Sequence, residues 1–300
     1  MKDGADTRSG LRLGLISLAL VALGFAALFV FGPSRSGPAA LPPETPEPNL
    51  LFTVFEDQAT RDAVTALRAV SPSTYAELDT AIRFARADNA AVPVLSQLVL
   101  EALFSQFQSQ ALSLRSAESA DYHAIIAGLA DGLRALKSQN SPWCDGPAIA
   151  DFLAQNDADL VPALLAEFPY QSAQYDWAMT WMTRILGAMQ TGQAHARPYA
   201  RPTLRDEIIL QQEGIALGSE QWALAAQVFA FANAEGTSYG QMQDVIAGID
   251  VCDLGIALET VSKRLPEQVR ARIWADLMPE IMVGNTPYVM WRVTDYFFIG

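Results

Sequence analysis

The chain has 300 residues, of which 51% are hydrophobic, 9% aromatic and 18% charged. This composition excludes a disordered chain, a collagen and a disulfide-rich miniprotein, because none of these classes combines such length with so large an apolar fraction. The formal net charge of −13 opposes long-range attraction to phosphate backbones, so we expect no nucleic acid partner.

An uncharged apolar segment lies close to the N-terminus, from Leu13 to Phe31. A helix of this length rises about 1.5 Å per residue and covers roughly 28 Å, which is close to the hydrocarbon thickness of a bilayer. The basic residues near the segment are concentrated before it: Lys2, Arg8 and Arg12. This bias predicts a cytoplasmic N-terminus (1–12), a single transmembrane helix (13–31) in the inner membrane, and export of everything that follows to the periplasmic side.

A cleavable signal peptide is the alternative, and cleavage would release the same domain as a soluble protein. We favour an uncleaved anchor, because a signal peptide core has only about 7–15 apolar residues. In addition, the nearest small-residue cleavage site, Pro38-Ala39-Ala40, carries proline at its first position. Residues 32–50 contain six prolines and are predicted to form an extended linker that holds the exported domain (51–300) away from the membrane.

The only two cysteines are Cys144 and Cys252. An even number of cysteines in an oxidising compartment usually means pairing, so we predict a disulfide between them. Buried free thiols are the alternative. An acid follows each cysteine, Asp145 and Asp253, and a neighbouring negative charge disfavours a reactive thiolate.

Helical periodicity runs through the exported domain. The segment Val94–Leu114 carries one apolar stripe, and Tyr122–Lys137 repeats the pattern. A further helix is predicted to lie in the centre of the core, because it is apolar on nearly every side; its residues include Tyr175, Trp177, Met179, Trp181, Met182, Arg184, Leu186 and Met189. We therefore predict an all-α fold, an irregular multi-helix bundle without regular repeats.

Helix starts are predicted where a hydroxyl side chain stands three residues before an acid. Thr74 with Glu77 and Thr203 with Asp206 fit this capping pattern, and Thr286-Pro287 places a cap before a proline. A turn-rich stretch at 191–202 with two prolines is the best candidate for a subdivision of the domain.

Residues Tyr239–Gln243 resemble the Gly-Leu-Met-Gln stretch of lytic transglycosylases over about five residues. The resemblance implies a helical cell-wall-degrading enzyme in which one glutamate, here Glu213 or Glu118, is both acid and base. Against it, Glu213 stands 27 residues before Gly240, and a predicted helix, Trp222–Ala234, replaces the loop expected between them. The enzyme is therefore the alternative prediction.

Two surface features are candidate partner-binding sites. Arg197 and Arg201 lie in a repeated Ala-Arg-Pro segment that could bracket an anionic group, although we favour their neutralising the acids of this domain. The C-terminal run includes Trp291, Tyr296, Phe297 and Phe298. We expect this run to dock on its own domain, with docking on another protein as the alternative.

The sequence carries no nucleotide-binding loop, no zinc-protease motif, no Cys-x-x-Cys pair and only two histidines. We therefore expect no cofactor and no metal site. The preferred interpretation is a membrane-anchored envelope protein whose helical domain acts as an interaction, scaffold or accessory subunit of a larger membrane or periplasmic assembly.

Overall fold

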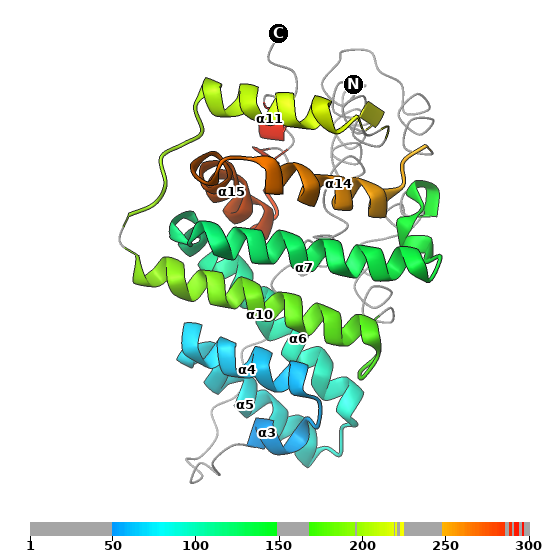
Figure 1. Ribbon diagram of the computed structural model, residues 1–300. Helices are drawn as coiled ribbons and strands as arrows, with labels where there is room; N and C mark the ends of the chain where they lie inside the picture. Colours follow the sequence, from blue (N-terminus) through cyan, green and yellow to red (C-terminus); the bar gives the residue numbers. More distant parts are fainter. Residues whose placement is uncertain are drawn as a thin grey trace, which may run out of the picture.

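The computed structural model describes residues 50–148, 168–195, 197–218 and 248–285, together with single positions at 220, 223, 224, 288, 289, 291–293 and 296 (Figure 1). The predicted membrane helix Leu13–Phe31 and residues 32–49 of the predicted linker lie outside these residues, and Leu50, predicted as the end of the linker, begins a helix. Among the described helices none is both long enough and apolar enough to cross a membrane. In the described ranges there is no strand and only one isolated β-bridge, between Asp145 and Asp250, so the all-α prediction is confirmed for them.

Most of the helices lie side by side in one row (Figure 1). In order along the row these are α4 (Gln58–Val70), α10 (Ala173–Ala194), α7 (Ser119–Ser138), α14 (Val251–Arg264) and α11 (Leu204–Leu217). The order in space differs from the order in the chain, because α10 inserts between α4 and α7. Each inner helix therefore has a packed neighbour on both sides, whereas α11 ends the row.

A second group of helices covers this row. The group consists of α5 (Pro72–Ala87), α6 (Val92–Gln110), the 3-10 helix η1 (Ala111–Ser116) and α15 (Glu267–Met282). In this group α5 packs on α6, and η1 packs on α15 and on α10. Two shorter elements complete the description: α3 (Leu50–Val54) and η2 (Pro142–Cys144).

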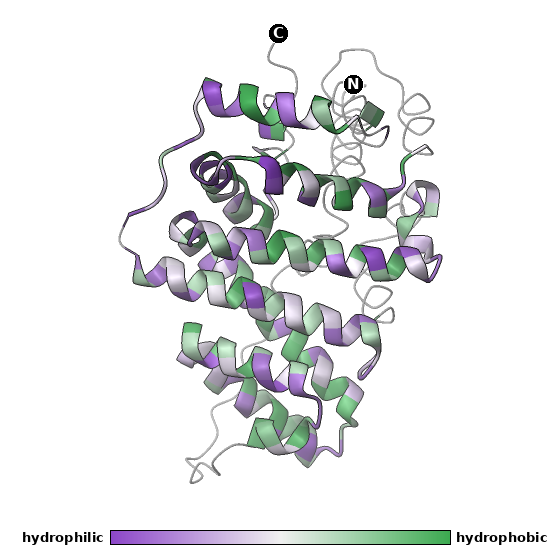
Figure 2. Ribbon diagram, viewed as in Figure 1, coloured by the Kyte–Doolittle hydropathy of each residue, from purple (hydrophilic) through white to green (hydrophobic). Residues whose placement is uncertain are grey.

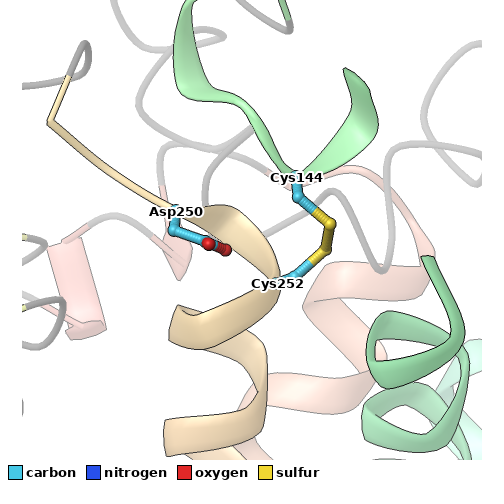
Figure 3. Close-up of side chains that lie close together, drawn as sticks. All are labelled: Cys144, Asp250 and Cys252. Atoms are coloured by element: carbon cyan, nitrogen blue, oxygen red, sulfur yellow. A yellow bond between two sulfur atoms is a disulfide. The ribbon is translucent and has the colours of Figure 1, made fainter. Parts of the chain in front are cut away.

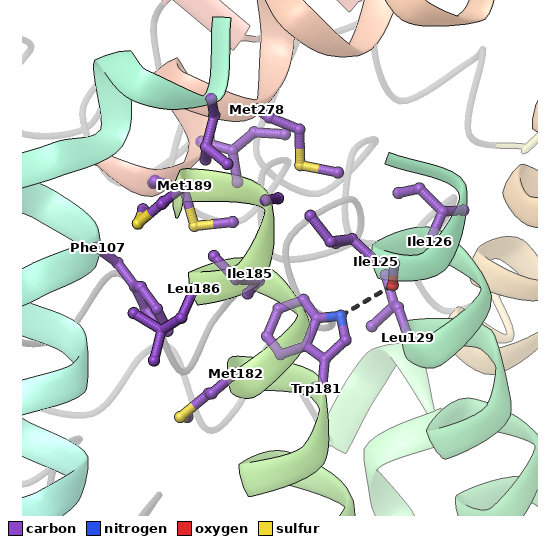
Figure 4. Packing of buried hydrophobic residues seen from close by; sticks show 14 of the residues in the cluster. Phe107, Ile125, Ile126, Leu129, Trp181, Met182, Ile185, Leu186, Met189 and Met278 are labelled. Atoms are coloured by element: carbon purple, nitrogen blue, oxygen red, sulfur yellow. Dashed lines mark hydrogen bonds between the residues drawn. The ribbon is translucent and has the colours of Figure 1, made fainter. Parts of the chain in front are cut away.

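The centre of the core is the contact between α10 and α7. The predicted apolar stripe of α10 is confirmed, because Tyr175, Met179, Met182, Leu186 and Met189 are all buried. Figure 2 shows apolar residues on all of the labelled helices, and the buried ones form one hydrophobic cluster. Trp181 inserts against α7, where its indole N–H donates a 2.9 Å hydrogen bond to the Ile125 carbonyl (Figure 4).

The two helix-start patterns had different outcomes. The Thr203 prediction is confirmed, because its hydroxyl and the Asp206 carboxylate cap one another at the start of α11. The Thr74 prediction is wrong. The helix already begins at Pro72, and Ser71 accepts the hydrogen bond from the Thr74 N–H. Proline is favoured in the first turn, so Ser71-Pro72 was the stronger start signal.

Two boundaries also differ from the predictions. The helix predicted to reach Leu114 ends at Gln110, and η1 continues the chain with a tighter pitch. Residues 191–194 belong to α10, so the irregular segment begins at His195. One continuous hydrophobic core includes residues from both sides of this segment. The predicted start at Thr286-Pro287 lies outside the described residues.

Candidate functional site

The disulfide predicted between Cys144 and Cys252 is present (Figure 3). It joins the end of η2 to the first turn of α14, and the two Cα atoms are 4.9 Å apart. Next to it, the Gly146 N–H donates a 3.2 Å hydrogen bond to the Ile249 carbonyl. The disulfide therefore links two chain segments that are 108 positions apart.

Charged side chains surround the disulfide. Asp250 caps α14 by accepting a 2.8 Å hydrogen bond from the Asp253 N–H. The Lys137 ammonium group binds the carboxylate of Asp253 and, at 3.1 Å, that of Asp250, and these bonds raise the pKa of Lys137. The cluster thus anchors the start of α14 to the end of α7.

Three residues of a metal-ligating type lie together in the same region. Cys144, Asp250 and Cys252 each place a ligand atom within 4.8 Å of the others (Figure 3). Metal ions bind cysteine as the thiolate, and here the two sulfur atoms are bonded to each other. The Asp250 carboxylate is also engaged by Lys137 and by the start of α14. The arrangement is therefore a structural cross-link.

The two glutamates of the enzyme alternative lie on different helices. Glu118 immediately precedes α7, where its N–H donates to the Asp121 carboxylate, and its own carboxylate lies 3.8 Å from His195 on the exposed surface. Glu213 is half-buried on α11. The stretch Tyr239–Gln243 lies outside the described residues. In the described part of the chain Glu118 stands at the start of a helix, and neither glutamate can be placed relative to Tyr239–Gln243. The enzyme alternative therefore stays a prediction.

The segment 197–203 is an extended, exposed strap between α10 and α11. It is fixed at Tyr199, whose N–H donates a 3.1 Å hydrogen bond to the Arg115 carbonyl. Arg197 and Arg201 are exposed and form no ion pair with any other described residue. Among the described residues neither carboxylates nor helix carbonyls contact these two guanidinium groups, so the role of both arginines stays a prediction.

The C-terminal run places its described side chains in two environments. Val289, Val293 and Tyr296 are buried, which fits docking of the run on its own domain. Trp291, by contrast, has 55% of its surface exposed. Phe297 and Phe298 lie outside the described residues. Among the described partner-binding candidates of this run, Trp291 is therefore the one that is accessible to a partner.

A buried ionic cluster behind the C-terminal run was missed by the sequence analysis. The Arg292 guanidinium group donates to Asp276 at 3.0 Å and to Glu207 at 3.4 Å. The hydroxyl groups of Tyr288 and Tyr296 donate to the same Asp276 carboxylate, at 3.0 and 2.9 Å. Burial raises the pKa of Tyr296, since the charged phenolate would be desolvated beside Asp276. The cluster ties α11, α15 and the C-terminal run together.

A second ion pair holds the start of α11. Arg272 donates two hydrogen bonds, of 2.9 and 2.5 Å, to the buried carboxylate of Asp206. Burial alone would raise the pKa of Asp206, but the hydrogen bonds from Arg272 and Thr203 outweigh it and lower this pKa. The partners are 66 positions apart, so no local sequence pattern could have revealed the pair.

The outer face of α11 is apolar. Leu204, Ile208 and Ile215 expose 57%, 41% and 77% of their surfaces, whereas Leu210 and Gly214 on the opposite face are buried. The sequence analysis did not single out this stripe.

Comparison with known proteins adds no further guide, because no family model, curated protein or solved structure matches the chain significantly.

Proposed function

We propose that the chain is a single-pass inner-membrane protein with a cytoplasmic N-terminus, whose exported helical domain serves as an interaction, scaffold or accessory subunit of an envelope assembly. The observation that carries the proposal is the Cys144–Cys252 disulfide. Disulfides form and persist in oxidising compartments and are rare in the cytosol. An apolar N-terminal segment with a basic flank gives the route by which the domain would reach such a compartment.

The disulfide also suits a domain that works without the protection of the cytosol. In the chain-entropy model, closing a loop of roughly 100 residues stabilises a fold by up to about 4.7 kcal/mol. The closed loop here contains α10, α11 and the strap between them. These are the elements that carry the exposed arginines and the apolar stripe, so the bond stabilises the surfaces that we assign to binding.

Binding is favoured over catalysis by the use that the fold makes of its polar residues. Asp206 and Asp276 are occupied by ion pairs inside the domain, and Glu118 stands at a helix start. By contrast, Trp291 and Arg201 reach the surface. Exposed tryptophan and arginine are the residue types that most often dominate the energy of protein interfaces.

The compartment is tested with the full chain in a bacterial host. Alkaline phosphatase, which needs export for activity, is fused after Gly300, and the chain is probed with a thiol-reactive polyethylene glycol before and after reduction. We expect an active fusion, no labelling before reduction and two added labels afterwards. The variant Cys144→Ser/Cys252→Ser is the control for labelling. An inactive fusion with two thiols that label without reduction would contradict export.

The binding role is tested by crosslinking in intact cells followed by purification in mild detergent. A companion protein in constant ratio to the chain is the expected result. The same preparation is incubated with isolated cell-wall material. Wall cleavage that disappears in Glu213→Gln or Glu118→Gln would instead support the lytic alternative and overturn the assignment as a binding subunit.

A further inference from the structure

The apolar stripe on α11 lies at the end of the helix row, where the described part of the molecule gives it no neighbour (Figure 1). Leu204, Ile208 and Ile215 are spaced four and seven positions apart, so they lie on one face of the helix. Three large aliphatic side chains in one row on an exposed face are unusual for a water-exposed helix, and such rows mark association surfaces.

The stripe does not result from a loosely attached helix. The inner face of α11 is held by buried Leu210, by the two hydrogen bonds from Arg272 to Asp206, and by the contact of Glu207 with Arg292. The helix presents a firmly held surface. A preorganised surface loses little conformational entropy when it binds.

Opposite charges stand near the two ends of α11. Arg205 is exposed in the first turn of α11, and Glu220 is exposed just after the left-handed cap at Gly218. Within the described residues neither side chain forms an ion pair. The helix has 14 residues, or roughly 21 Å at about 1.5 Å per residue, so the two charges cannot meet within one chain.

We propose that a second copy of this chain docks on the stripe with its α11 antiparallel to the first. Antiparallel pairing places Ile208 of each copy against Ile215 of the other and Arg205 of each beside Glu220 of the other. A two-fold axis repeats every contact, which is the commonest symmetry of homo-oligomers. The opposed helix dipoles add a favourable contribution.

The rim of the surface also suits this occupant. The Trp291 ring lies 5.3 Å from the Arg292 guanidinium carbon, and Arg292 in turn reaches Glu207 on α11. The exposed Trp291 indole is thus linked through Arg292 to the helix that carries the stripe. The contact joins positions far from α3, where the described domain begins, so docking leaves that end of each copy free (Figure 1).

One helix pair buries a small area, so the expected affinity is weak in solution. Anchoring both copies in one membrane would raise their effective concentration. The self-association of the purified full chain in detergent is therefore measured by analytical ultracentrifugation over a range of roughly 1 to 300 μM protein, with a Kd at or above the micromolar level expected.

A charge swap is the decisive test. We expect Arg205→Glu and Glu220→Arg to weaken self-association about tenfold each, and the double variant to recover to within about threefold of the original Kd. Ile215→Asp should abolish association, whereas Leu112→Asp, at a site 66% exposed on η1, should leave it unchanged. Melting temperatures confirm that each variant is folded.

A second measurement fixes the register. Gln212 is exposed and close to the proposed axis, so Gln212→Cys should form an intermolecular disulfide under mild oxidation, and Arg86→Cys on α5 should not. Three outcomes would overturn the proposal. The first is a monomer at every concentration. The second is self-association that survives Ile215→Asp but is lost on Ala22→Leu in the predicted membrane segment, and the third is a different protein, bound to the chain in place of a second copy, whose binding is lost on Ile215→Asp.

Discussion

The middle and the end of the helix row are stabilised by different interactions. In the middle, α10 and α7 approach closely because glycine stands where tryptophan must fit; a side chain at Gly132 would overlap the Trp177 indole. At the end, α11 is attached through the Asp206–Arg272 and Glu207–Arg292 ion pairs.

The contrast shows how the place of a helix in the row is related to the interactions that hold it. The contact between α10 and α7 is stabilised by shape and apolar burial, which depend little on pH or salt. A helix with a neighbour on one side only has less apolar surface to bury there. Here charged pairs give that helix a fixed position and leave its outer face available for binding. Three measurements test this contrast.

The largest effect is expected from the buried tryptophan of the middle region. Trp181→Ala removes a side chain that is 2% exposed and leaves a large cavity between α10 and α7, so we expect a loss of about 3–5 kcal/mol in the free energy of unfolding. Trp291→Ala, at the end region, should cost less than about 1 kcal/mol, because more than half of its surface is exposed. Denaturant unfolding of the full chain, followed by circular dichroism, measures both. Equal losses would remove the contrast between the regions.

A smaller effect is expected from two glycines of the same helix. A Cβ atom at Gly192 would collide with the backbone carbonyl of Ser113, whereas a Cβ atom at Gly187 would meet nothing within 4 Å. We expect Gly192→Ala to destabilise the domain by about 1–3 kcal/mol, as overpacked sites do. Gly187→Ala should be neutral or stabilising by up to about 1 kcal/mol, since alanine is the better helix former. Thermal melting distinguishes the pair, and similar melting temperatures would show that η1 yields at the crossing.

The smallest effect concerns acid at the end region. The pKa of Asp206 is lowered in the folded state, so its contribution is complete above the unfolded pKa of about 4 and is lost as the pH falls through the lower folded value. We expect Asp206→Asn to reduce stability by about 1–2 kcal/mol at pH 7 and to flatten the loss of stability below pH 4. Glu213→Gln, on the same helix, is the matched control for the loss of one carboxylate. If the slope of stability against pH is unchanged in Asp206→Asn, this ion pair does not contribute to the stability of the end region.

Local patterns predicted much of the fold. The spacing of Tyr175, Met179 and Met182 placed α10 in the core, and Thr203 with Asp206 marked the start of α11, because these signals lie within one or two helical turns. The end of α10 was predicted too early. The turn-rich stretch predicted at 191–202 includes Gly192, but this position is glycine because the backbone of η1 crosses there.

The candidate sites were less predictable for the same reason. The cysteine pair could be predicted, since only two cysteines exist and the N-terminal segment predicts export to an oxidising compartment. The cluster around Arg292 could not, because its partner Glu207 is 85 positions away in the chain. The exposed apolar face of α11 could not be predicted either, because the sequence does not show which helix stands at the end of the row in space.

The strap between α10 and α11 has a consequence for proteolysis. Both of its arginines precede proline, Arg197-Pro198 and Arg201-Pro202, and trypsin does not cut bonds whose nitrogen belongs to proline. The strap should thus survive trypsin despite its exposure and be cut by chymotrypsin after Tyr199. Because this position lies inside the loop closed by Cys144 and Cys252, one such cut would open the covalent ring without releasing a fragment, and the two pieces would separate only after reduction.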